Sequence, residues 1–298
     1  MGQSAAQAWQ ILQPGISLFY LDAMHPGLGN KGYKLKPILH EAKARGASCV
    51  VSLGGVWSNH VLALAQLGNT VGLSTVGLIR GDAAAPRTAM LNDAVSFGMH
   101  LEFISRGTYR NRHLLSFVEQ IEQSYPGSYF VPEGGSSALG VAGAREIVGD
   151  VERQLGRVNE LYLPVGTGGT MAGILCALNH PCHVVGVSAL KKIEAQQSDI
   201  ARWTQGQVHP GVTFELLPET RFGGYGRCPP ALQRLMQEFE AAHNVLLDPI
   251  YNAKCLAYAL RAAESHNKKA NRVILHTGGL QGRRGYPSLE ARLNLATV

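Results

Sequence analysis

The sequence predicts an α/β fold built around a mostly parallel sheet. Short runs rich in Val, Ile and Leu alternate along the chain with longer amphipathic stretches. This alternation is typical of strand–helix–strand units, which pair their strands in parallel. In addition, glycine-rich segments at residues 54–55 and 166–169 follow two of the apolar runs and precede helical patterns. Because open parallel sheets bind ligands beyond the carboxyl ends of their strands, both segments mark candidate site loops.

The expected elements follow from apolar runs of strand length and from apolar residues at helical spacing. The expected strands are Cys49–Leu53, Leu73–Ile79, His100–Ile104, Ser128–Val131, Glu160–Val165, His183–Ser188 and Arg272–His276. The expected helices are Lys36–Arg45, Val61–Leu67, Arg87–Phe97, Asn111–Ser124, Leu139–Leu155, Thr170–Leu178, Ala231–Ala242 and Ala253–His266.

Composition places the chain among well-buried globular proteins. Its 298 residues suffice for two modest domains or one large one, and 45% are hydrophobic while only 16% are charged. The net charge of +6 comes from dispersed Lys and Arg, without the basic cluster that nucleic-acid binding requires. It suits a small anionic ligand. No apolar run approaches the length of a membrane span.

Cysteine and histidine usage points to a reduced protein without a metal. The five cysteines form no CxxC pair, and the eleven histidines show neither HxxxH spacing nor a Cys-His cluster. Residues 1–20 lack a basic leader followed by a long apolar core, so no signal peptide is expected. These observations predict a cytoplasmic protein.

The first chemical motif is Gly29-Asn30-Lys31-Gly32-Tyr33, which we expect to place a lysine in a turn. A lysine that forms a covalent bond with a carbonyl must be desolvated and held near its partner. Most lysines in glycine-rich turns are simply solvated, so this motif alone is weak. Lys34 and Lys36 compete for the same role.

The second motif, Gly54-Gly55-Val56-Trp57-Ser58-Asn59-His60, follows an expected strand and opens an expected helix. Hydroxyl and amide groups beside the free N–H groups of a helix N-terminus suit an anion. Ser and Asn are also common helix caps for stability alone. His60 is expected to contact the site or simply to begin the helix.

The third motif, Gly166-Thr167-Gly168-Gly169-Thr170, lies between an expected strand and helix. Glycines let the backbone approach an anion, so the segment is either a phosphate loop or a tight strand–helix turn. It is neither a Walker motif nor a GxGxxG fingerprint with an acidic partner.

Three further candidate site residues follow turns or end a strand, namely Tyr225, Tyr251 and Thr277.

Together these motifs resemble the pyridoxal 5'-phosphate (PLP) enzymes of the tryptophan synthase β-subunit fold type. The branch they resemble contains D-cysteine desulfhydrase and 1-aminocyclopropane-1-carboxylate (ACC) deaminase. The resemblance implies two open, mostly parallel twisted sheets with helices on both faces. PLP then lies in a cleft between a large domain (residues 1–35 and 137–298) and a small domain (36–136). It also implies a homodimer.

The resemblance also implies a role for each motif residue. Lys31 is the Schiff-base lysine, and Lys34 is a supporting residue. Asn59 bonds the cofactor ring oxygen, Gly166, Thr167, Gly168, Gly169 and Thr170 bind its phosphate, and Thr277 faces its pyridine nitrogen. The implied catalytic residues are Lys31, Ser58, Tyr225 and Tyr251, and the implied substrate-binding residues are Ser58, Asn59, His60, Tyr225 and Tyr251.

The expected reaction is α,β-elimination and deamination of a small amino acid, with D-cysteine as the favoured substrate. Known ACC deaminases of this branch carry Glu and Leu where this chain has Asn252 and Thr277, whereas D-cysteine desulfhydrases carry threonine at both positions. Asn252, Leu21, Leu28 and the segment Leu280–Gly285 depart from the family pattern. The alternatives are an ACC deaminase or another deaminase, dehydratase or racemase, a non-catalytic PLP or amino-acid binding protein, and a nucleotide-binding protein.

Overall fold

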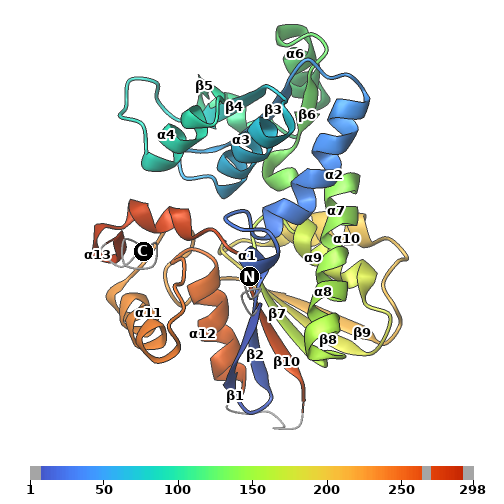
Figure 1. Ribbon diagram of the computed structural model, residues 1–298, viewed down its shortest axis with the longest axis vertical. Coiled ribbons are helices and arrows are strands. Elements are labelled where there is room, and N and C mark those ends of the chain that lie inside the picture. Colours follow the sequence, from blue (N-terminus) through green and yellow to red (C-terminus); the bar gives the residue numbers. More distant parts are fainter. Residues whose placement is uncertain (1–7, 264–269, 291–298) are drawn as a thin grey trace, which may run out of the picture.

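The computed structural model describes residues 8–263 and 270–290, and within them the chain forms two open sheets (Figure 1). The larger sheet has six strands in the order β1-β2-β10-β7-β8-β9, and the smaller has four in the order β5-β4-β3-β6. Only the β1–β2 pair is antiparallel. The fold class expected from the sequence is therefore confirmed.

The larger sheet draws its strands from both ends of the described chain. Parallel pairing places β2 next to β10, where Leu18 faces Ile274, and β10 next to β7, where Val273 faces Leu161. Its strands are β1 (Trp9–Gln13), β2 (Ile16–Tyr20), β7 (Glu160–Val165), β8 (Cys182–Ser188), β9 (Val212–Leu217) and β10 (Arg272–His276).

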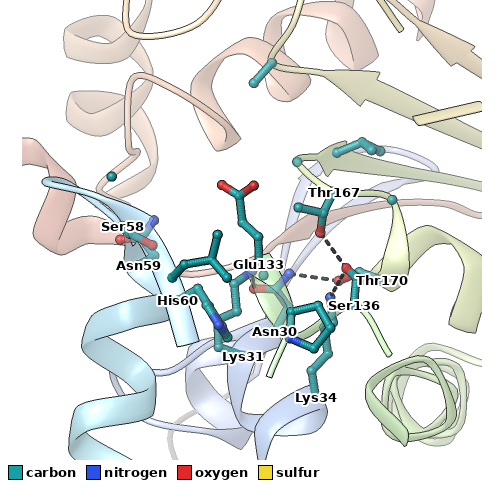
Figure 2. Close-up of a pocket in the computed structure, with 18 of the residues that line it drawn as sticks. Asn30, Lys31, Lys34, Ser58, Asn59, His60, Glu133, Ser136, Thr167 and Thr170 are labelled. Atoms are coloured by element: carbon teal, nitrogen blue, oxygen red, sulfur yellow. Dashed lines mark hydrogen bonds between the residues drawn. The ribbon is translucent and has the colours of Figure 1, made fainter. Parts of the chain in front are cut away.

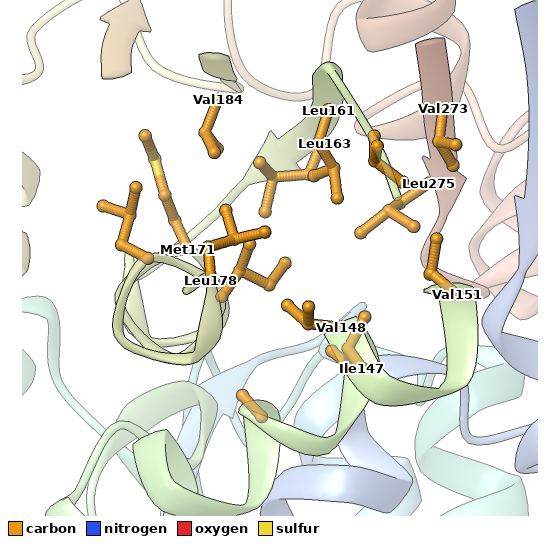
Figure 3. Packing of buried hydrophobic residues seen from close by; sticks show 14 of the residues in the cluster. Ile147, Val148, Val151, Leu161, Leu163, Met171, Leu178, Val184, Val273 and Leu275 are labelled. Atoms are coloured by element: carbon orange, nitrogen blue, oxygen red, sulfur yellow. The ribbon is translucent and has the colours of Figure 1, made fainter. Parts of the chain in front are cut away.

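Helices cover both faces of this sheet. On one face, α8 (Glu146–Leu155), α9 (Gly169–Ala177) and α10 (Glu194–Thr204) pack on Leu161, Leu163 and Leu275 (Figure 3). On the other face, α11 (Pro230–His243) and α12 (Asn252–Ala263) pack on alternate strand residues such as Leu18 and Ile274. Nearly continuous apolar strands are the expected consequence of burial on both faces.

The smaller sheet is covered in the same way. Its strands are β3 (Val50–Gly55), β4 (Thr75–Arg80), β5 (His100–Ile104) and β6 (Tyr129–Val131). On one face lie α2 (Asn30–Ala44), α3 (Asn59–Val71) and α4 (Ala89–Ser96), while α5 (Arg106–Arg110) and α6 (Leu115–Ser124) lie on the other. The remaining short elements are α1 (Leu21–Met24), η1 (Glu133–Gly135), α7 (Ala138–Ala144), η2 (Leu280–Gly285) and α13 (Pro287–Glu290).

Helix α2 connects the two sheets, and it corrects one expectation. Lys31 lies in the first turn of α2, not in a turn outside the helix. The glycines that suggested a turn have other uses: Gly29 precedes the helix with φ 50°, while Gly32 lets the helix contact His25 closely. Tyr33 packs in the core of the larger sheet, and Leu35 and Leu39 pack in that of the smaller. The domain boundaries at 35/36 and 136/137 remain predictions, and the first falls within α2.

The other differences from the expected elements have local causes. The expected helix Leu139–Leu155 divides at Arg145 into α7 and α8, and α7 packs closely on α2, where a Cβ at Gly143 would overlap the carbonyl oxygen of Tyr33. Sequence analysis missed the strands β1, β2 and β9. The edge strand β9 exposes half of its residues, and Thr213 and Glu215 interrupt its apolar residues. The last three residues of the expected helix Ala253–His266, residues 264–266, lie outside the described residues.

Candidate functional site

A cavity of about 1400 Å³ lies between the two sheets, and the predicted site residues meet there (Figure 2). Its walls include Lys31 from α2, Ser58, Asn59 and His60 from the start of α3, and the loop after β7. Tyr225, Tyr251 and Thr277 complete the set. Of the predicted residues, only Gly169 does not line the wall. The volume exceeds the few hundred Å³ that a small amino acid alone requires.

Lys31 faces this cavity from the first turn of α2. Its Nζ donates a hydrogen bond to Asn30 Oδ1 at 3.2 Å. Burial lowers the pKa of Lys31 to about 8, because removal of water penalises the charged amine. A substantial fraction of this amine is therefore neutral near pH 8, which is the form that attacks a carbonyl carbon.

Lys34 lies one turn further along α2 and creates an anion-binding corner. Its side chain is only 1% exposed, yet its Nζ donates to Ser136 Oγ at 3.1 Å and has no carboxylate partner among residues 8–263 and 270–290. Burial and then the Lys31 charge lower the pKa of Lys34 well below its usual value. Because a buried cation without a counter-charge is costly, this corner is suited to bind an anion.

The loop between β7 and α9 forms the other side of this corner. Gly168 has φ 87°, and a Cβ at Gly169 would lie 2.8 Å from Lys34 Nζ, so only a glycine lets the helix N-terminus approach this amine. Thr167 Oγ1 lies 2.7 Å from Ser136 Oγ, and Asn30 Nδ2 donates to Thr170 Oγ1 at 3.0 Å. The corner thus joins a lysine, hydroxyls and the positive end of α9, the groups that bind phosphate.

Ser58 and Asn59 open α3 on the opposite wall of the cavity. Ser58 Oγ accepts a hydrogen bond from the Val61 N–H at 3.3 Å, so Ser58 is a helix cap as well as a cavity residue. Asn59 Oδ1 is buried without a hydrogen-bond partner among the described residues. An unpaired buried amide oxygen in a cavity wall is a group that a ligand can satisfy.

His60 is the second residue of α3 and is only 3% exposed. Ser52 donates its hydroxyl proton to the carbonyl oxygen of Val131 at 2.7 Å, so at 2.8 Å it accepts one from His60 Nε2. Nδ1 is then unprotonated, and burial followed by the Lys31 and Lys34 charges lowers the pKa of His60 well below its usual value. His60 is therefore a neutral residue in the wall.

Asn252 does not line the cavity but lies behind Thr277. Its Oδ1 accepts hydrogen bonds from the Thr277 N–H at 2.8 Å and from the Thr277 hydroxyl at 3.3 Å. Its Nδ2 donates to Asp248 Oδ2 and to the carbonyl oxygen of Gly278. Asn252 therefore fixes the orientation of Thr277. Because the Thr277 hydroxyl donates its proton to Asn252, its oxygen can still accept a hydrogen bond from another group.

The two tyrosines lie together in the wall of the cavity. The rings of Tyr225 and Tyr251 are edge to face, with centroids 6.3 Å apart. Burial and then Tyr225 raise the pKa of Tyr251 well above its usual value, so this phenol keeps its proton. Buried Glu219 and Lys254 hold the backbone before Tyr225, because Glu219 accepts the Gly224 N–H and Lys254 donates to the Gly224 carbonyl oxygen.

The segment Leu280–Gly285, which departs from the family pattern, contributes one residue to the cavity, Gln281. The fully buried Arg283 instead binds Glu240 on α11, with Nη1 and Oε1 2.5 Å apart. Arg284 pairs with Asp93 on α4, next to the smaller sheet. Both arginines of this segment therefore form ion pairs with other helices and do not line the cavity.

Sequence analysis missed several cavity residues, including Ser136, Glu133, Gln196, Arg80, Tyr109 and Arg112. The run Glu133-Gly134-Gly135-Ser136-Ser137 follows a predicted strand, and the glycine–serine signal that singled out residues 54–59 could have found it. Gln196 accepts a hydrogen bond from Ser188 and donates one to the carbonyl oxygen of Gly166, but no local pattern marks it.

Comparison with known proteins gives a consistent result. Residues 11–278 match the family model described as "Pyridoxal-phosphate dependent enzyme". A "Putative 1-aminocyclopropane-1-carboxylate deaminase" of Pyrococcus abyssi is 28% identical over 85% of this chain and 81% of that protein. A "D-cysteine desulfhydrase" of Salmonella paratyphi B is 27% identical over 84% and 82%. The crystal structure of an "ACC deaminase homologue" has a TM-score of 0.76 at 22% identity, over 95% of this chain and 89% of that one.

This chain therefore belongs to the family of pyridoxal-phosphate-dependent enzymes, and its cofactor is PLP. The residues of the cavity fit that cofactor. An aldehyde can bond the Lys31 amine, a phosphate can neutralise Lys34 beside the N-terminus of α9, and the unpaired Asn59 amide can meet a polar group of the ring.

Two further observations concern residues 8–263 and 270–290. No three His, Cys, Asp or Glu side chains are arranged to hold a metal ion. No helix there is long and apolar enough to cross a membrane.

Proposed function

We propose that this chain catalyses the PLP-dependent α,β-elimination and deamination of a small amino acid, with D-cysteine as the favoured substrate. For D-cysteine the products are pyruvate, sulfide and ammonia. One observation carries the proposal: Lys31 and Lys34 meet one cavity from successive turns of α2, and Lys34 lies in the corner suited to phosphate. Family membership and the relatives' names support it.

We assign the chain's own residues as follows. Lys34, Thr167, Thr170 and the first N–H groups of α9 hold the phosphate, and Lys31 holds the cofactor covalently. When bound, PLP withdraws electrons from the substrate α-carbon and makes the α-proton acidic. Thr277 faces the ring nitrogen as a neutral hydroxyl, with its orientation fixed by Asn252.

The substrate carboxylate binds at the N-terminus of α3 in this proposal, where Ser58 and Asn59 lie. The candidate bases for removal of the α-proton are Lys31, Ser58 and Tyr251. Lys31 is favoured over Tyr251, because an amine with pKa about 8 exchanges protons near neutral pH and the strongly raised pKa of Tyr251 keeps its phenol protonated. Tyr251 and Tyr225 orient the substrate or donate a proton. His60 supports the wall beside them.

The first experiment is an absorption spectrum of the purified protein before and after borohydride, followed by peptide mapping. We expect a visible band that borohydride abolishes and a reduced cofactor on the peptide that contains Lys31. In Lys31→Ala no label should be trapped, whereas Lys36→Ala, with its exposed lysine on the same helix, should be labelled like the wild type. A colourless protein that stays colourless with added PLP contradicts the proposal.

The second candidate is an ACC deaminase, which the names of other relatives favour. A turnover panel of D-Cys, ACC, D-Ser and L-Ser separates the two, and it also reveals a dehydratase. A protein that forms the coloured species but turns over none of them is instead a binding protein. A homodimer and a cytoplasmic location complete the proposal, and sedimentation of the loaded protein tests the former.

A further inference from the structure

Two arginines that line the cavity stack on one tyrosine ring. The guanidinium carbon of Arg80 lies 5.0 Å from the centroid of the Tyr109 ring, and that of Arg112 lies 4.6 Å from it. Both side chains line the cavity, and the Tyr109 side chain is buried. Stacking holds each guanidinium in place, as arginine–aromatic contacts commonly do.

Only one of these two charges is neutralised. Arg112 Nε lies 2.8 Å from Glu133 Oε2, and the Tyr109 hydroxyl donates to the other oxygen of that carboxylate. Arg80 has no carboxylate within ion-pair distance among the described residues. The nearby Asp82 accepts the Ala84 N–H instead, at 2.9 Å. Glu133 thus neutralises Arg112, whereas Arg80, an exposed residue that also lines the cavity, has no carboxylate partner among the described residues.

Arg80 also lies on the side of the cavity where the substrate is expected. It is the last residue of β4, and its partner across the parallel pair is Gly55 at the end of β3. A Cβ at Gly55 would lie 3.5 Å from Arg80 Nη2. Ser58 follows three residues later and caps α3. Arg80 therefore stands next to the proposed substrate carboxylate site, whereas the phosphate corner belongs to Lys34.

We infer that Arg80 binds a second anionic group of the substrate, so that the site selects an amino acid whose β-substituent ends in a carboxylate or a phosphate. A planar guanidinium pairs with either group through two parallel hydrogen bonds. This inference rests on the proposed function and narrows its substrate class. D-cysteine, which has no such anionic group, then binds more weakly than the members of this class.

The test compares anionic and neutral amino acids of similar size on the PLP-loaded enzyme. Aspartate is paired with asparagine, and O-phosphoserine with serine, in both enantiomers. The apparent Kd is read from the rapid change in the visible spectrum, before turnover. We expect at least one anionic member to bind about tenfold more tightly than its neutral partner. The two pairs distinguish carboxylate from phosphate, and the preference should weaken as salt rises.

Arg80→Gln should reduce this ratio to about one and leave the affinity for the neutral member unchanged, which also shows that the variant folds. Arg202→Gln is the matched control, because Arg202 lines the same cavity but already pairs with Asp199 at 2.7 Å. It should keep the ratio of the wild type.

Three results would overturn the inference. They are equal binding of anionic and neutral members by the wild type, an unchanged ratio in Arg80→Gln, and an equal loss of the ratio in Arg202→Gln. A missing cofactor band in the same samples contradicts the proposed function itself, and the inference falls with it. The two failures are therefore distinguishable.

Discussion

Lys31 and Lys34 show how far neighbouring residues of one type can differ. Both lie on the first two turns of α2. Lys34 is buried beside hydroxyls and the N-terminus of α9, where an anion can neutralise it. Among the described residues the Lys31 amine bonds only the Asn30 amide oxygen, and burial lowers its pKa to about 8. The first environment suits charge pairing, and the second suits a neutral nucleophile.

This difference predicts how attachment of the cofactor depends on pH. Protein stripped of PLP should bond it only through neutral Lys31, whose fraction falls about tenfold for each pH unit below the pKa. The initial rate of appearance of the visible band should therefore rise from pH 6 to about 8 and level off above it. Stopped-flow absorbance over pH 6 to 10 measures this rate. A rate that still rises tenfold between pH 9 and 10 contradicts a lowered pKa.

At the scale of elements, the start of α2 decides where Lys31 lies. Gly29 has positive φ, and the next residue, Asn30, donates its N–H to the carbonyl oxygen of Thr277 at 3.2 Å. A Cβ at Gly29 would overlap that same oxygen. The helix that carries the lysine is thus anchored directly on the loop that carries Thr277.

Gly29→Ala should therefore damage both the fold and the site. Gly46, just beyond the other end of α2, offers a matched control, because it also has positive φ but no atom lies within 4 Å of its would-be Cβ. We expect Gly46→Ala to cost about 1 kcal/mol from backbone strain alone. Gly29→Ala should cost at least about 2 kcal/mol more and weaken cofactor binding.

Urea unfolding of the cofactor-free proteins measures these costs, and titration with PLP measures the affinity. Equal effects of the two substitutions would show that the contact between Gly29 and Thr277 does not position α2.

At the scale of the whole molecule, η2 links parts that the chain order separates widely. Arg283 reaches Glu240 on α11 and also donates to the carbonyl oxygens of Leu247 and Leu289. Arg284 reaches Asp93 on α4, beside the smaller sheet. One short segment thus ties the larger sheet's helical layer to the other half of the molecule, next to the cavity.

These two neighbouring arginines should contribute very differently to stability. Arg283→Met removes the guanidinium that pairs with the buried Glu240 carboxylate and should cost about 3–5 kcal/mol. Arg284→Met removes a partly exposed pair and should cost no more than about 1 kcal/mol. Chemical unfolding at pH 7 compares them. Similar costs for both would contradict the assignment of Arg283 as a buried tether.

The elements that the sequence predicted best are those whose signal is local. Strands β5, β7 and β10 have the predicted bounds, because each contains apolar residues in a strand pattern between turn residues or polar residues. The edge strand β9 has apolar residues but exposes half of its positions and was not predicted, and the break between α7 and α8 depends on contact with α2. Long-range contacts of this kind override local propensity.

The candidate site shows the same division. Motifs in the sequence identified Lys31, Ser58, Asn59, the loop at residues 166–170 and Thr277, because glycines and small polar residues after a strand are local features. The tertiary structure alone decided that Lys34 is a buried amine without a carboxylate partner among the described residues, that Asn252 orients Thr277, and that Arg80 and Arg112 share the Tyr109 ring. The physical reason is that burial and charge pairing depend on residues distant in the chain, which only the packed fold brings together.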